Sequence, residues 1–150
     1  MKSGFYNNTV FHRHGRTATS TPFVLQGGGY TTPVLSTVLF PAPKAASAPI
    51  ALEVGRGLSN VRYSLAMART NVLNSATSEF FINTVDNVVL DTPGGGYAVF
   101  GNVTTGTTLV DAMVAAPCNL SPLNFNSGFT VSTDCVPEPN LVIAGATQTR

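Results

Sequence analysis

Charged side chains are scarce in this sequence of 150 residues, and their scarcity bears on its function. Asp, Glu, Lys and Arg make up 10% of the residues, against roughly 25% in an average soluble domain. The formal net charge is +1, so the chain has no strong field that would hold nucleic acid or anionic lipid. We therefore expect no nucleic-acid partner.

Long hydrophobic runs are lacking as well. No apolar stretch approaches the roughly 18 residues that a membrane-spanning helix needs. Residues 1–8 do not contain the hydrophobic core of a signal peptide. We therefore expect no membrane span, and this sequence shows no leader.

Cysteine is nearly absent, with Cys118 and Cys135 as the two residues of this type. The segment between them is rich in Asn, Ser and Gly, as is common in loops that a disulfide closes. A bridge would imply an oxidising compartment, and the low charge also favours a periplasmic or secreted protein. Two separate thiols in a cytoplasmic protein is the alternative. Neither cysteine has a second Cys or a His nearby, so we expect no metal site.

Several motifs that would indicate other chemistry are absent. The sequence has no G-x-S-x-G nucleophile elbow and no P-loop. His12 and His14 lie two residues apart, a spacing that is weak support for a metal site. We interpret them as a core or solvated histidine pair.

Short extended segments dominate what is present, and most end at turn residues. Gly27–Gly29 is expected to close one of them, and the Pro- and Ala-rich stretch 41–49 is typical of a surface loop. Residues 64–68 fit a helix or a strand equally well. The expected strands cover residues 9–11, 23–26, 79–83, 97–103 and 141–146.

One helix is predicted, from Thr107 to Ala116. Thr107 or Thr108 can cap its N-terminus, and Pro117 ends it. Apolar residues recur at helical spacing along it, from Leu109 to Met113 and from Val110 to Val114. The sequence therefore predicts a mainly β protein with one helix near 107–116, in a single domain over residues 1–150.

A series of motifs resembles the cyclophilins, and the motifs occur in the order found in that family. The resemblance runs from Phe5 to about Ala116, and it implies a cyclophilin-like antiparallel β-barrel. The usual N-terminal strands and first helix of that barrel have no counterpart in the sequence, so the barrel is expected to be N-terminally incomplete. The matching segments are Phe5–Arg13, Phe23–Gly29, Leu65–Arg69, Asn74–Asn83, Leu90–Asp91 and Tyr97–Gly101.

The resemblance implies peptidyl-prolyl cis/trans isomerase activity without a cofactor, in a monomer that acts on proline-containing peptides and unfolded proteins. Arg13 is the implied catalytic residue, because its guanidinium would donate a hydrogen bond to the prolyl nitrogen of the twisted amide. The implied substrate-binding residues are Phe23, Val24, Gln26, Ala68, Arg69, Glu79, Phe81, Leu90 and Tyr97.

Two departures from the family bear on activity. The chain has extra residues between Arg13 and Phe23, in the polar stretch 14–22, and these are expected to alter the aim of Arg13. Glu79 stands where the family has Gln, which led to the hypothesis that its carboxylate pairs with Arg13 and that mild acid raises activity. Two alternatives stay open: a non-catalytic module that binds proline-containing peptides, and an inactive fragment.

Overall fold

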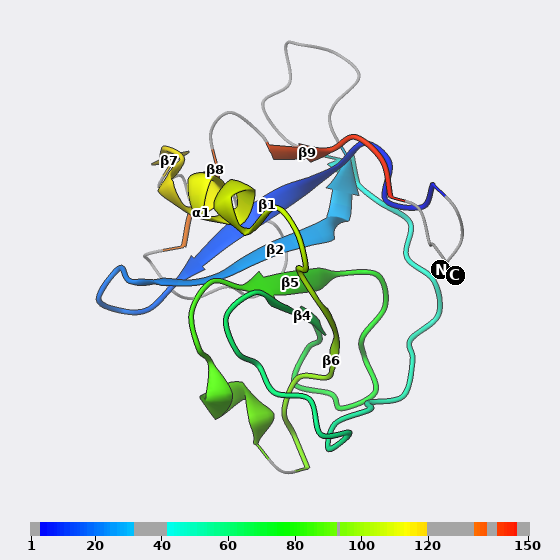
Figure 1. Ribbon diagram of the computed structural model, residues 1–150. Coiled ribbons are helices and arrows are strands. Elements are labelled where there is room, and N and C mark those ends of the chain that lie inside the picture. Colours follow the sequence, from blue (N-terminus) through cyan, green and yellow to red (C-terminus); the bar gives the residue numbers. More distant parts are fainter. Residues whose placement is uncertain (1–3, 32–41, 93, 120–133, 138–140, 147–150) are drawn as a thin grey trace.

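The computed structural model describes residues 4–31, 42–92, 94–119, 134–137 and 141–146. Its main element is a 7-stranded antiparallel sheet in the order β6-β4-β5-β2-β1-β9, with β3 (Ala42–Pro43) added to β2. The strands β6 and β9 are the two ends of this order, so the sheet formed by the described strands stays open. Figure 1 shows α1 beside the long β1–β2 hairpin, with β4, β5 and β6 below it.

The hairpin consists of β1 (Thr9–Arg16) and β2 (Pro22–Thr31), and both strands are longer than the sequence predicted. The glycine run was expected to end β2, but it continues the strand. Gly28 has a φ of 88°, and a Cβ on it would lie 2.7 Å from the carbonyl oxygen of Ser78. Glycine is therefore required there by both backbone conformation and close packing, and the pairing with β1 shifts register on this side.

Residues 64–67 resolve the helix-or-strand ambiguity in favour of β4 (Ser64–Met67). This strand lies between β5 (Phe80–Asn83) and β6 (Val99–Asn102). Phe80 and Phe81 point to opposite faces of β5, as neighbouring strand residues do. Phe80 joins one buried cluster with Phe11 and Leu25, whereas Phe81 joins a second with Val24.

The helix α1 (Thr107–Ala115) begins and ends as the sequence predicted, to within one residue. Its cap differs from the prediction: the N-cap residue is Gly106, in the left-handed conformation with φ 79°, and no side chain caps the helix. Of the two apolar series that the sequence shows along the helix, the one that starts at Val110 is buried: Val110 is 5% exposed and packs on the Phe80 cluster, whereas Leu109 is 64% exposed.

Several short elements lie beside the main sheet or at its edge. The 3-10 helix η1 (Val88–Asp91) precedes β6, β7 (Cys118–Asn119) pairs with β8 (Val136–Pro137), and β9 (Leu141–Ile143) pairs with the start of β1. Among the described residues, none of the helices is long and apolar enough to span a bilayer.

Candidate functional site

The structure brings Arg13 and most of the predicted substrate-binding residues around one hollow of about 170 Å³, called here the Arg13 pocket. The side chains come from both strands of the hairpin, from the residues after β4, from β5, from η1, and from the segment between η1 and β6. Glu79 is the one predicted residue that does not line it. The lining residues are Arg13, Phe23, Val24, Gln26, Ala68, Arg69, Phe81, Leu90 and Tyr97.

The apolar side of the pocket is continuous with the core of the sheet. Val24 and Phe81 are 3% and 4% exposed, so the core holds both in place. Leu90 and Tyr97 pack against their cluster from the other side, with the Phe81 and Tyr97 rings edge to face at a centroid distance of 5.5 Å. This seat is pre-formed and apolar, which suits a small aliphatic ring or side chain.

Arg13 lies on β1 directly opposite Gln26 on β2. Its Nη1 donates to Gln26 Oε1 at 3.0 Å, and its Nε donates to Asp134 Oδ2 at 2.7 Å. The extra residues that follow Arg13 do not form a loop over the pocket, because His14 to Arg16 continue β1 and residues 17–21 make the turn. The extra residues therefore lengthen the hairpin, and Arg13 remains paired with Gln26.

Asp134 is the residue that sequence reasoning missed. Its side chain is 10% exposed, and that of Arg13 is 19% exposed, so the ion pair is shielded from water. The other carboxylate oxygen, Oδ1, accepts the backbone N–H of Arg16 at 2.9 Å. No motif marks Asp134 in the sequence; its one local signal is that it precedes Cys135.

The contacts of Glu79 correct the hypothesis of a direct pair with Arg13. Gln26 lies between them, because its Nε2 donates to Glu79 Oε2 at 2.6 Å while its Oε1 accepts from Arg13. Glu79 also lies 3.4 Å from His12 Nε2. The carboxylate that pairs with Arg13 is that of Asp134.

The acid activation expected from Glu79 does not follow either. Burial raises the pKa of this carboxyl, but hydrogen bonds from His12 and Gln26 and the charges of His12 and Arg13 outweigh burial and bring the pKa below its usual value. Glu79 therefore stays ionised in mild acid, and its protonation requires a more acidic solution than the hypothesis assumed.

Arg69 forms the charged rim of the pocket. Its Nε donates to the carbonyl oxygen of Gly96 at 3.0 Å, and its guanidinium lies 5.0 Å from the centre of the Tyr97 ring. These contacts fix both side chains at the mouth of the hollow.

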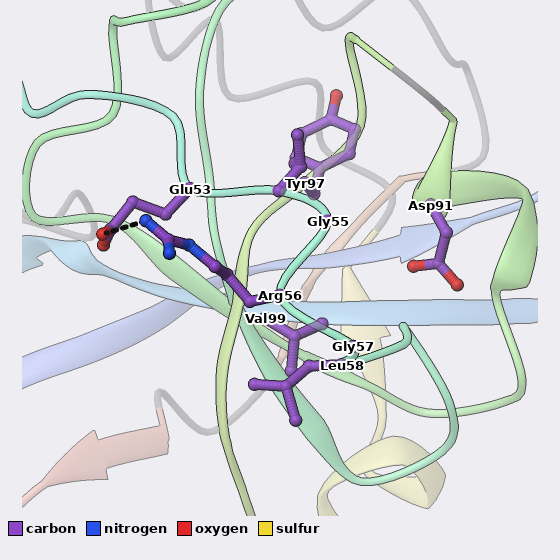
Figure 2. A pocket seen from close by; sticks show the side chains of 9 residues that line it. Glu53, Gly55, Arg56, Gly57, Leu58, Asp91, Tyr97 and Val99 are labelled. Carbon is purple, nitrogen blue, oxygen red and sulfur yellow. Dashed lines mark ion pairs between the residues drawn. The ribbon is translucent and has the colours of Figure 1, made fainter.

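A second hollow, of about 220 Å³, adjoins the first at Tyr97, which lines both. Figure 2 shows the ion pair of Arg56 and Glu53 on one side of this hollow and Asp91 on the other, with Tyr97 and Val99 between them. Tyr97 is the residue that the two hollows share.

Gly15 supports Arg13 by having no side chain. A Cβ on Gly15 would lie 2.8 Å from Val24 Cγ2 and 3.2 Å from Arg13 Cζ and Nη2. Because Val24 is buried, Gly15→Ala is expected to displace the Arg13 guanidinium. For the catalytic role that the resemblance implies for Arg13, we expect kcat/KM for a proline peptide to fall by ~10- to 100-fold, the size of effect that a small misplacement of a catalytic group produces.

Gly101→Ala is the matched control for this change. Gly101 also lies in a strand, β6, and a Cβ there would meet nothing within 4 Å. Both variants are to be compared with the parent in the same peptide isomerisation assay, with circular dichroism to check folding. Equal activity of the two variants would show that the space beside Gly15 does not position Arg13.

The described residues contain no group of three His, Cys, Asp or Glu side chains arranged to hold a metal ion. His12 and His14 are both buried, as the core interpretation expects. Cys135 is disulfide-bonded, and the one other cysteine of the sequence is Cys118, in β7. The pairing of these two cysteines stays a prediction.

Comparison with known proteins gives consistent matches. A family model described as cyclophilin type peptidyl-prolyl cis-trans isomerase matches residues 1–144. The chain is 45% identical over 118 residues to a peptidyl-prolyl cis-trans isomerase of Streptomyces antibioticus, covering 75% of the chain and 64% of that protein. It is 41% identical over 128 residues to one of Acinetobacter baylyi, covering 84% of the chain and 62% of that protein.

A solved structure shares the fold. It is a cyclophilin type peptidyl-prolyl cis-trans isomerase of Cryptosporidium parvum, determined in the presence of the dipeptide Ala-Pro. The TM-score is 0.61 at 20% identity, over 94% of this chain and 74% of that one. The chain thus spans less than two thirds of the length of the two bacterial relatives above, while most of its own length is matched.

Proposed function

The chain belongs to the cyclophilin-type peptidyl-prolyl cis-trans isomerase family, and on that premise we propose that it accelerates rotation about X-Pro bonds in peptides and unfolded proteins. The Arg13 pocket is the proposed active site, and the reaction needs no cofactor. The observation that carries the proposal is the placement of Arg13 beside an apolar seat formed by Phe23, Phe81 and Leu90.

The chemistry follows from amide resonance. Rotation about a peptide bond has a barrier of roughly 18–20 kcal/mol, because the C–N bond is partly double. In the twisted state the prolyl nitrogen becomes pyramidal and accepts a hydrogen bond that the planar amide does not accept well. A guanidinium fixed beside that nitrogen therefore binds the twisted state more tightly than the ground state, which is the requirement for catalysis.

The substrate class is supported by the shape of the site. The apolar hollow suits a prolyl ring, and the adjoining hollow beyond Tyr97 gives room for neighbouring residues of an extended peptide. Ala-Pro was present with the related Cryptosporidium parvum protein. We propose that this chain likewise accepts the residue pair X-Pro, with proline in the apolar seat.

The test is an isomerisation assay on a proline-containing peptide. Exchange NMR monitors the reaction, so the assay needs no coupled protease. We expect the chain to raise the exchange rate between the cis and trans signals. A folded chain that broadens or shifts the peptide signals without faster exchange would instead be a proline-peptide binding module. Absence of a cooperative melting transition in circular dichroism would identify an inactive fragment.

A further inference from the structure

We propose that Asp134 is a positioning residue for Arg13, and that the disulfide-anchored segment around Cys135 holds it in place. The inference rests on the proposed function of the Arg13 pocket and adds a residue that none of the sequence motifs contains. It also makes the alignment of the catalytic group dependent on the oxidation state of the protein.

Two hydrogen bonds hold the guanidinium of Arg13 in the described part of the structure. Nε donates to Asp134 at 2.7 Å, and Nη1 donates to Gln26 at 3.0 Å. Because the guanidinium is planar and rigid, two fixed hydrogen bonds determine both its position and the orientation of its plane. The contact with Asp134 is the charge-assisted one of the two and is therefore the stronger constraint.

The carboxylate of Asp134 is itself fixed from two directions. Its second oxygen accepts the N–H of Arg16 at 2.9 Å, so the group is tied to the strand that carries Arg13. The next residue, Cys135, exchanges backbone hydrogen bonds with His14, at 2.8 Å and 3.3 Å. Asp134 thus lies in a short extended segment that is added to the outer side of β1.

Apart from its hydrogen bonds to β1, this segment is attached to the rest of the described molecule through few elements. The following residues form β8, which pairs with the two residues of β7, and Cys135 is disulfide-bonded. A two-residue strand pair contributes little stability by itself. The disulfide is therefore a second restraint on where Asp134 lies, beside the hydrogen bonds to β1, and its reduction is expected to loosen the contact with Arg13.

Asp134→Asn tests the positioning role, because it keeps the shape of the side chain and removes the charge. We expect kcat to fall by about tenfold with KM nearly unchanged, since a group acting through Arg13 affects the twisted state more than ground-state binding. Asp111→Asn is the matched control: Asp111 also pairs with an arginine, Arg62, at 2.9 Å, but both side chains are about half exposed and neither lines the pocket.

A second readout does not depend on turnover. The heteronuclear NMR signal of the Arg13 Nε–H group should be shifted downfield and exchange slowly with water in the parent, and should lose both properties in Asp134→Asn but not in Asp111→Asn. An isomerisation rate of zero for the parent would refute the proposed function, while this signal would still decide whether Asp134 holds Arg13. An unchanged signal and unchanged kcat in Asp134→Asn would overturn the inference.

The role of the disulfide is tested on the parent and on Asp134→Asn. A mass spectrum of the protein made under oxidising conditions should show no free thiol, in agreement with a Cys118–Cys135 bridge. Reduction should lower kcat of the parent toward that of Asp134→Asn and should change Asp134→Asn little, because both treatments remove the same restraint. An equal fractional loss in the two proteins, or no loss in the parent, would refute the link between the disulfide and Arg13.

Discussion

Arg13→Ala is expected to lower kcat/KM for a proline peptide by ~10²- to 10³-fold, the loss usually seen when a fixed donor to a transition state is removed. The affinity for the peptide should change much less. The apolar seat of Phe23, Phe81 and Leu90 remains in the variant. Under the proposed function, this seat is expected to hold the prolyl ring in the planar and twisted states alike. The measurement is a pair of titrations, one of isomerisation rate and one of binding.

Folding has to be separated from catalysis in this experiment, because Asp134 is mostly buried beside Arg13. Removing one partner of a buried ion pair leaves an uncompensated charge and typically costs about 3–5 kcal/mol. Arg13→Lys is the companion variant, since it keeps a cation next to Asp134 while lacking the planar fork. We expect it to fold and yet not to restore turnover. Equal losses of binding and turnover in Arg13→Ala would mark Arg13 as a general contact only.

The residues of the pocket were predictable because each lies in a short local pattern. Val24 and Gln26 lie two positions apart in one strand motif, and Phe81 lies in another, and the alternation along a strand predicts which side chains share a face. The same alternation places Phe80 away from the pocket. Its neighbour Phe81 lines the pocket, whereas Phe80 packs in the core cluster on the opposite face of β5. The local sequence pattern was sufficient to predict a pocket residue where the strand itself determines the orientation of the side chain.

Long-range partners were not predictable in this way. Asp134 is 121 positions from Arg13, and no periodicity connects them. The placement of Glu79 failed for a related reason: the motif predicts that Glu79 lies near Arg13, but it does not show that the amide of Gln26 lies between them. The stretch 14–22 was expected to disturb Arg13, but residues 14–16 pair with β2 as a continuation of β1, and residues 17–21 form the turn.

His14 is expected to make the folded state sensitive to mild acid. Its side chain is fully buried, and burial together with the charge of Arg16 lowers the pKa of the imidazole to about 4, against an opposing effect of Asp134. In the unfolded chain the pKa is near the ordinary value of about 6.5. Between these two values the unfolded state binds a proton that the folded state does not bind.

The sign of the effect follows from that difference in proton binding. Stability rises with pH wherever the unfolded state binds more protons, so the free energy of unfolding should be at its full value above pH ~6.5 and fall as the pH is lowered toward ~4. A shift of this size corresponds to about 3 kcal/mol at one buried site. Glu79 and Asp91 have lowered pKa values, so their contribution to the free energy of unfolding is lost in more acidic solution. They therefore add little to the pH dependence in this window.

His14→Asn removes the titrating ring and keeps a polar atom near Arg16, whose Nη2 lies 3.4 Å from His14 Nδ1. Urea unfolding of the oxidised parent and of the oxidised variant, at several pH values between neutral and about 4.5, measures how the free energy of unfolding of each protein changes with pH. We expect the variant to be less stable at neutral pH, because a smaller side chain leaves a cavity, but to lose much less stability on acidification. If parent and variant lose stability in parallel, His14 is not the group that unfolds the protein in acid, and protonation of the carboxyls would account for the loss.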